Sequence, residues 1–310
     1  MLSDFLYIVW DADPALLTIG DFELRYYGLM WAITFILGER FFTSFVRREG
    51  FNQRVVETAF VWIVLGAVLG ARIGHCMFYE FSYYITKPWA IITEFRNGGM
   101  ASHGSALGML FGMWVTSRKY KMPYVWWLDR IMIPVAIGGA LVRFGNLMNS
   151  EIVGNVTTLP WGFQFVRNFN LPAAEIPAQH PAQLYEALCY LVTFAILFYL
   201  YYKQDQGRRH PGLMFSIGLF GIFLTRFFVE FVKVDQSDFE AGMILNMGQL
   251  LSIPFVLLGV WMLWQSKKGR FPIGKPDKFN AAEDAKAAES TNQTPKLNNK
   301  NKPHKHGRRS

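Results

Sequence analysis

The sequence predicts an all-α, polytopic membrane protein with seven transmembrane helices. The 310-residue chain is 52% hydrophobic and only 17% charged, with 28 Phe and 10 Trp, which is too apolar and aromatic for an ordinary soluble domain. Its apolar residues gather in segments of about 20 residues, the length that crosses a bilayer as a helix. Basic residues are concentrated in every second loop, as expected when each segment crosses the membrane.

The seven apolar segments follow one another along most of the chain, with polar loops between them. The predicted helices are 27–46, 57–79, 102–118, 124–146, 184–202, 211–231 and 242–264. The second and third carry glycines at four-residue spacing, a pattern that lets two membrane helices approach closely. These glycines are Gly66, Gly70, Gly74, Gly104, Gly108 and Gly112.

The loop charges predict the orientation. The loops after the first, third and fifth helices are basic, and so is the C-terminal tail, whereas the N-terminus and the remaining loops are acidic or nearly neutral. Since basic loops stay in the cytoplasm, the N-terminus is expected outside and the C-terminus inside. The basic loop residues are Arg47, Arg48, Arg54, Arg118, Lys119, Lys121, Lys203, Arg208 and Arg209.

The composition divides the chain into two regions. Residues 265–310 hold 12 Lys or Arg and 4 Asp or Glu, so the rest of the chain is balanced, with 19 residues of each sign. We predict a seven-helix membrane catalytic domain over 1–264 and a basic, disordered cytoplasmic tail over 265–310. The positive charge of the tail indicates an anionic membrane surface as partner rather than nucleic acid.

Polar residues embedded near the helices fall almost entirely in the outer half of the predicted bundle. A proton or ion path would need polar groups across the whole thickness. A pocket that is polar at headgroup depth and apolar below it instead favours a lipid ligand. The two exceptions at the inner side of the bundle are Glu39–Arg40, which can pair or snorkel, and Asp129–Arg130, which we interpret as a structural pair.

The densest polar segment is residues 143–154, at the outer end of the fourth helix. It combines Arg143 with two amides, a carboxylate and two glycines. A guanidinium fork matches a phosphate diester better than an ammonium does. Gly145 and Gly154 permit close backbone approach or a positive φ. The alternative interpretation is a helix end with a snorkelling arginine and a polar turn.

Three further candidates lie in the same layer, each with a structural alternative. Arg226 and Glu230 are four residues apart on one helix face, either as an ion pair or with Glu230 orienting Arg226 toward a phosphate. His103 opens the third helix and can cap it, act as a base or bind a phosphate. Tyr27 is either an interfacial aromatic or a site residue. The outer histidines lack metal-ligand spacing, so no metal site is expected.

Several motifs resemble those of the bacterial prolipoprotein diacylglyceryl transferase family, in the same order from about residue 18 to 264. The motifs are Arg143-x-Gly-Asn-x-x-Asn-x-Glu-x-x-Gly154, Tyr26-Tyr-Gly-Leu-Met30, Gly70-Ala-Arg-Ile-Gly74, Gly98-Gly-Met-Ala-Ser-His-Gly104, His180-Pro-Ala-Gln-Leu-Tyr-Glu186 and Met247-Gly-Gln-Leu-Leu-Ser-Ile-Pro254.

The resemblance implies seven membrane helices, an external N-terminus, location in the bacterial inner membrane and an active site toward the outer leaflet. It implies transfer of the diacylglyceryl group of phosphatidylglycerol to the lipobox cysteine of a prolipoprotein signal peptide, with glycerol 1-phosphate as leaving group and no cofactor or metal. One position departs from the family pattern. Some members carry a tyrosine four residues before the arginine of the sixth helix, where this chain has Ile222.

On this basis we predict two groups of site residues. The catalytic group is Tyr27, His103, Arg143, Arg226 and Glu230. The substrate-binding group is Arg72, Arg143, Asn146, Asn149, Glu151, Gly154 and Gln249. The two arginines would stabilise negative charge on the departing phosphate, and His103 is the base best suited by type to the thiol, although it could instead hold the phosphate.

Two other classes of function remain as alternatives. A lipid transporter or flippase would need polar residues in both leaflets and usually an internal repeat, and neither is visible. A seven-helix receptor or scaffold would not need clustered arginines and glycines at the outer surface.

Overall fold

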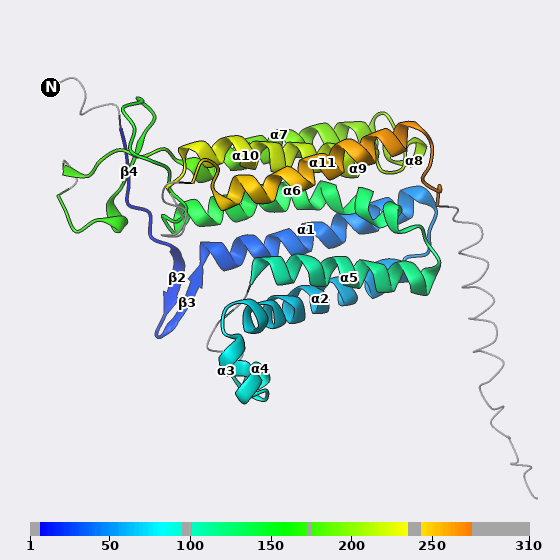
Figure 1. The fold of residues 1–310 in the computed structure, drawn as a ribbon, viewed down its shortest axis with the longest axis horizontal. Helices are drawn as coiled ribbons and strands as arrows, with labels where there is room; N and C mark the ends of the chain where they lie inside the picture. Colours follow the sequence, from blue (N-terminus) through cyan, green and yellow to red (C-terminus); the bar gives the residue numbers. More distant parts are fainter. Residues whose placement is uncertain (1–6, 95–98, 100, 173–174, 235–242, 275–310) are drawn as a thin grey trace, which may run out of the picture.

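A computed structural model describes residues 7–94, 99, 101–172, 175–234 and 243–274. Long helices run side by side along the bundle (Figure 1), and most of the smaller elements lie at one end of it. The long helices are α1 (Tyr26–Glu49), α2 (Arg54–Phe78), α5 (Ser102–Tyr120), α6 (Tyr124–Met148), α7 (Ala182–Tyr202) and α11 (Met247–Lys267). The shorter helices are α3 (Phe81–Thr86), α4 (Ala90–Thr93), η2 (Val166–Asn168), α8 (Gln206–Arg209), α9 (Leu213–Leu219), η4 (Phe220–Leu224), α10 (Thr225–Val229) and η5 (Glu230–Val232).

The structure contains a helix at each of the seven predicted positions. The sixth is composite, because α9, η4, α10 and η5 follow one another without a break over 213–232, and η4 is a π-helical turn. Among the described residues, six helical segments are long and apolar enough to cross a membrane, and the glycine-rich α5 is not one of them. The protein is therefore a mostly helical, polytopic membrane protein.

The last long helix begins later than the sequence predicts. Asn246 caps α11 by accepting the backbone N–H of Gln249, and the Gln249 side chain accepts the N–H of Asn246 in return. This reciprocal capping box satisfies two N–H groups that would otherwise lack partners and fixes the start of the helix. The same helix extends to Lys267, beyond the predicted domain boundary at 264. Most of the predicted tail lies outside the described residues.

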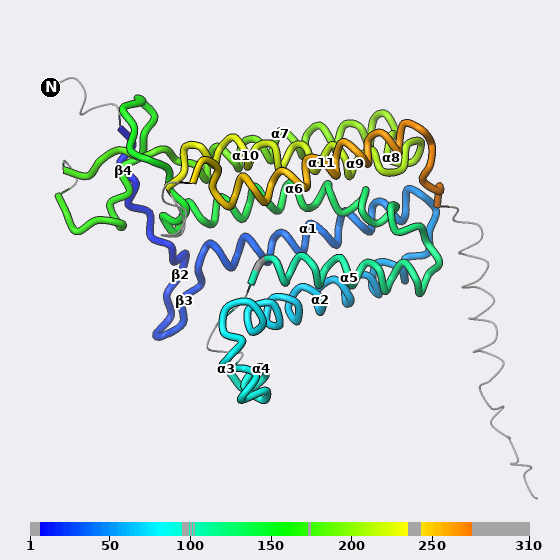
Figure 2. The backbone as a smooth tube through the Cα atoms, viewed as in Figure 1, coloured from blue at the N-terminus to red at the C-terminus, as the bar shows by residue number. Residues whose placement is uncertain are grey.

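The all-α prediction is wrong in one respect, because the described residues also form two small sheets. Strands β2 (Ala15–Ile19) and β3 (Phe22–Arg25) make an antiparallel hairpin that projects from the start of α1 (Figure 2). Its turn contains Gly20 with φ of +58°, a conformation that glycine adopts without strain. Strands β1 (Ile8–Trp10) and β4 (Phe163–Phe165) pair in parallel across a long stretch of chain, a contact that no local pattern reveals.

Helices α2 and α5 pack closely against each other through the predicted glycines (Figure 1). A Cβ added at Gly66 would lie 2.2 Å from the carbonyl oxygen of Gly108, and one added at Gly70 would lie 2.3 Å from that of Gly104. The backbones touch at these points, so only glycine fits there. The small-residue pattern in the sequence thus identified a real helix–helix contact.

At the opposite end of the bundle from the sheets, a buried ion pair joins α1 to α6. The guanidinium of Arg130 binds the carboxylate of Glu49 at 2.8 Å, and Tyr201 donates a hydrogen bond to the same carboxylate. The predicted pairing of Arg130 with Asp129 is the weaker contact, at 3.7 Å. Asp129 instead accepts backbone N–H groups of Gly212 and Phe215 at the start of α9.

Replacing Gly108 with alanine should loosen the α2–α5 pair, because the new methyl group would lie 1.9 Å from the carbonyl oxygen of Gly66. We expect a loss of stability of about 1–3 kcal/mol, the usual cost of overpacking, measured as a lower melting temperature in detergent. Gly259→Ala is the matched control, since its Cβ would make only ordinary contacts at 3.4 Å or more. Equal melting temperatures for the two variants would contradict this account.

Candidate active site

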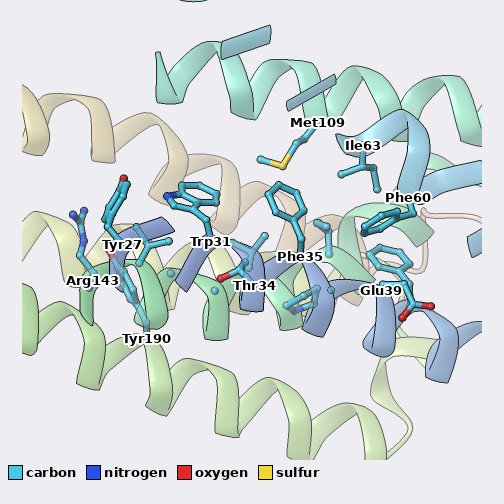
Figure 3. Close-up of a pocket in the computed structure, with 18 of the residues that line it drawn as sticks. Tyr27, Trp31, Thr34, Phe35, Glu39, Phe60, Ile63, Met109, Arg143 and Tyr190 are labelled. Carbon is cyan, nitrogen blue, oxygen red and sulfur yellow. The ribbon is translucent and has the colours of Figure 1, made fainter. Parts of the chain in front are cut away.

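A cavity of about 500 Å³ runs along α1, between this helix and α2 and α6. Figure 3 shows Tyr27, Arg143 and Tyr190 together at one end of the cavity and Glu39 at the other. The wall between these ends is mostly apolar and includes Trp31, Phe35, Ile63 and Val135. From Tyr27 to Phe42 the lining covers about 22 Å of helix, at 1.5 Å per residue. The cavity thus combines a polar end with a long apolar channel.

Arg143, near the end of α6, is held on two sides. Its Nε lies 2.5 Å from Oε2 of Glu186, and its Nη1 donates to the side-chain oxygen of Asn146 at 3.1 Å. Asn146 in turn donates to the Glu151 carboxylate at 3.2 Å, and Asn149 donates to the other oxygen of that carboxylate at 3.1 Å. The guanidinium therefore has a fixed orientation toward the cavity that it lines.

The turn after α6 brings Glu151 back to the helix end. Ser150 and Ile152 have φ values of +54° and +57°, a region that branched side chains rarely occupy. The backbone oxygen of Glu151 accepts a hydrogen bond from Gln183 on α7, which holds the turn in place. Of the two possibilities given for Gly145 and Gly154, positive φ is not found at either; it occurs at Ser150 and Ile152. Ile152 itself lines the cavity.

Gly145 and Gly154 are both points of close approach. A Cβ at Gly145 would lie 3.0 Å from the Cα of Tyr27, so this glycine lets α1 and α6 meet beside the cavity. A Cβ at Gly154 would lie 2.5 Å from the Cβ of His180 and 2.6 Å from the carbonyl oxygen of Val232. The Gly154 segment is thereby clamped between the entry to α7 and the end of the sixth helical segment. Partial burial in this clamp lowers the pKa of His180.

Behind Arg143 lies a buried chain of charges. The ammonium of Lys233 binds Oε1 of Glu186 at 2.9 Å and Oε2 of Glu230 at 2.7 Å. Glu186, Lys233 and Glu230 are each at most 5% exposed. Charges removed from water are costly unless each has an opposite partner, so the four groups from Arg143 to Glu230 depend on one another.

Arg226 lies on α10 and lines the same cavity as Arg143. Its Nε is buried and has no hydrogen-bond partner, and it forms no ion pair with any described residue. Of the two interpretations of Arg226 and Glu230, the ion pair is wrong, because Glu230 binds Lys233 instead. Among the described residues, three cations thus accompany two buried carboxylates, and the guanidinium that has no carboxylate partner borders the cavity together with that of Arg143. This arrangement suits a bound anion.

Other predicted site residues lie outside the cavity lining. His103 is exposed in the first turn of α5. The guanidinium of Arg72 donates to the carbonyl oxygens of Ala90 and Ile91 and to the hydroxyl of Tyr84, and so attaches the short helices α3 and α4 to α2. Gln249 caps α11 and donates to the carbonyl oxygen of Phe227, near Arg226. Any role of these three residues with substrate stays a prediction.

Glu186, Tyr190 and Lys233 belong to the site but are absent from the residues that sequence analysis selected. Glu186 lies in the motif that begins at His180 and is a charge in an apolar helix, which is a usable signal. From the sequence, Lys233 would be assigned to the polar loop that follows the sixth helix, as a charged residue exposed to solvent. Only the fold shows that this side chain turns back between two carboxylates.

Comparison with known proteins agrees with this site. A model of the family described as prolipoprotein diacylglyceryl transferase matches residues 14–265. A protein of Porphyromonas gingivalis named phosphatidylglycerol–prolipoprotein diacylglyceryl transferase is 42% identical over 272 residues, covering 84% of this chain and 95% of that protein. A Bacteroides fragilis protein of the same name is 39% identical over 270 residues, with the same coverage.

The matched region contains the whole cavity, the charge chain behind it and all the predicted site residues. The family signature seen in the sequence is thus confirmed over most of the chain. The chain belongs to the prolipoprotein diacylglyceryl transferase family.

Proposed function

We propose that this protein transfers the diacylglyceryl group of phosphatidylglycerol to the lipobox cysteine of a prolipoprotein, with the reaction at the polar end of the cavity. Family membership supports the reaction, as do the names of the relatives. The observation that carries the location is that Arg143 and Arg226, from separate helices, border one cavity with a long apolar wall. This combination matches an anionic headgroup attached to acyl chains.

In the proposed complex the phosphate lies between the two guanidinium groups and an acyl chain follows the apolar channel. Arg143 is oriented by Glu186 and Asn146, whereas Arg226 has a free Nε to offer. A preformed pair of donors costs no rearrangement when negative charge builds up during the reaction. Glu230 takes part through Lys233, which keeps Glu186 in place behind Arg143.

In the reaction the cysteine sulfur attacks the glycerol carbon that bears the phosphate ester. A C–S bond forms, the C–O bond to phosphate breaks, and the bonding electron pair leaves with the phosphate oxygen as glycerol 1-phosphate. The thiol proton needs an acceptor, because only a few per cent of a free thiol is ionised at neutral pH. We assign this role to His103, which is exposed at the start of α5.

The remaining predicted site residues receive supporting roles in this proposal. Asn146, Asn149 and Glu151 form one hydrogen-bonded unit that orients Arg143. Gly154 keeps the segment carrying Lys233 close to α7, and Tyr27 borders the polar end of the cavity. We retain Arg72 and Gln249 as substrate-binding residues at the edge of the site.

We further propose that α5 is the seventh membrane-spanning helix, with the N-terminus outside and the C-terminus in the cytoplasm of a bacterial inner membrane. Successive long helices run in alternating directions along the bundle, and α5 runs beside α2 (Figure 1). The basic loops then lie at the end that carries Glu49 and Arg130, and the reaction site faces the outer leaflet. The proposed partners are phosphatidylglycerol, the prolipoprotein signal peptide and membrane lipids.

The proposed reaction is tested with purified protein, phosphatidylglycerol labelled in its acyl chains and a peptide that contains a lipobox cysteine. We expect a thioether-linked diacylglyceryl peptide and one equivalent of glycerol 1-phosphate. A peptide with serine in place of the cysteine is the control. Lipid movement across vesicles without any thioether product would instead indicate a transporter.

Substitution of Arg143 should reduce the rate of transfer, and the reduction should be larger when more of the guanidinium group's hydrogen-bond donors are lost. We expect no detectable product with Arg143→Ala and a loss of about 10²–10³-fold with Arg143→Lys, because an ammonium cannot contact Glu186, Asn146 and a phosphate in the same geometry. Arg118→Lys, at the far end of α5, is the matched control. Near-normal turnover of Arg143→Lys would show that the fork is not needed.

Lys233→Met should destabilise the protein by about 3–5 kcal/mol, since it leaves two buried carboxylates without their shared cation. The double variant Lys233→Met/Glu230→Met should recover part of this loss, because only Glu186 then remains and Arg143 still binds it. Melting temperatures in detergent measure both effects. A single variant as stable as the parent would contradict the charge chain.

His103→Gln should slow transfer by about 10²–10⁴-fold, the usual contribution of a general base. The measurement is the single-turnover rate of transfer in detergent, with binding of phosphatidylglycerol measured separately. A slower rate with unchanged lipid binding would support the base role. Normal turnover of the variant would assign the thiol proton to another acceptor.

A further inference from the structure

A second cavity, of about 410 Å³, lies near the opposite end of the bundle from the charge chain. It lies between the last turns of α1 and the end of α7 and shares no lining residue with the active-site cavity. Its lining consists of Arg40, Thr43, Ser44, Arg47, Arg48 and Tyr202. Three guanidinium groups and three hydroxyl groups therefore surround one hollow, and the proposed reaction uses none of them.

The amino-acid spacing explains how these groups come together. On α1, the other four residues follow Arg40 by three, four, seven and eight positions, which places all five on one face of the helix. The preceding turns of α1 are largely apolar. Its last turns, in contrast, present basic and hydroxyl side chains on this face. Tyr202, in the last turn of α7, closes the hollow, and its hydroxyl is hydrogen-bonded to Ser44 at 2.8 Å.

The cavity carries excess positive charge. Arg40 has one acidic neighbour, Glu39 at 3.7 Å, and its side chain is still 77% exposed. Arg48 donates to the carbonyl oxygen of Tyr202 at 3.1 Å and lies 5.3 Å from the centre of that ring, so its position is fixed without its charge being neutralised. Arg47 forms no ion pair with any described residue. Two of the three guanidinium groups thus have no carboxylate partner in the described part of the chain.

Aromatic residues extend from the basic hollow along α7. The ring centre of Phe198 lies 4.5 Å from that of Tyr202, and Phe198 is 39% exposed. Phe41 on α1 contacts Phe198 in turn, so the row of rings leads toward the middle of the bundle. A soluble anion would use only the guanidinium and hydroxyl groups. A phospholipid would use these groups for its phosphate and the aromatic rings for its acyl chains.

We propose that this cavity binds the phosphate of an anionic phospholipid from the cytoplasmic leaflet. Arg47 and Arg48 supply charge-assisted hydrogen bonds to the phosphate oxygens, and Thr43 borders the headgroup. Basic pockets between helices on the cytoplasmic side are suited to such headgroups. The site rests on the membrane orientation proposed above but not on the transfer reaction.

Native mass spectrometry of the full-length protein in detergent, with phosphatidic acid or phosphatidylcholine added, tests the site. We expect retention of phosphatidic acid over phosphatidylcholine, weakened about tenfold for each arginine removed in Arg47→Gln and Arg47→Gln/Arg48→Gln. The control Arg118→Gln/Lys119→Gln removes two basic residues from the same end of the bundle, outside the cavity, and should retain lipid like the parent.

Thr43→Leu provides a second variant that places a larger side chain in the cavity and keeps all three arginines. The Thr43→Leu protein should also retain less phosphatidic acid than the parent. If the double arginine variant does not fold, this variant alone tests whether the lipid binds in the cavity. Equal retention by the parent and both cavity variants would overturn the proposal. Equal loss in the control, or displacement of the lipid by millimolar inorganic phosphate, would also overturn it, because surface charge or a soluble anion would then explain the binding.

Discussion

The polar end of the main cavity depends on the contact between Arg143 and Glu186. A carboxylate with no exposure to solvent needs cations around it, and Glu186 obtains them from α6 and from Lys233 at the end of the sixth helical segment. This requirement brings three separate parts of the chain together at one point. Once they are together, Arg143 has a single orientation, and Arg226 lines the cavity without an ionic partner among the described residues.

The number of nearby carboxylates thus distinguishes two kinds of arginine in the same bundle. At the end of the bundle opposite the sheets, Arg130 is paired with Glu49 and contacts Trp126 and Tyr201, so it joins helices. Beside the main cavity, cations outnumber the buried carboxylates among the described residues, so Arg226 is not neutralised. Arg130 and Arg226 thus differ in the number of carboxylates that bind them among the described residues.

Much of this arrangement could be predicted from the sequence. Seven apolar segments predicted the helices to within a few residues, and the glycine spacing predicted the contact between α2 and α5, because both are local properties. The grouping of Arg143, Asn146 and Glu151 also follows from one short segment. The strand pair β1–β4, the partner of Arg130 and the inward turn of Lys233 join residues far apart in the sequence or depend on a chain reversal. No period or motif contains such information.

The π-helical turn at Phe220–Leu224 has a consequence for the direction of the side chains that follow it. A π turn adds one residue to a helix, and one residue corresponds to about 100° of rotation around the axis. The side chains that follow, Arg226 among them, therefore point about a quarter-turn away from where an uninterrupted α-helix would place them. Deleting a single residue from this turn would therefore turn the guanidinium group of Arg226 away from the cavity. The direction of the Arg226 side chain thus depends on the length of this short segment as well as on the arginine itself.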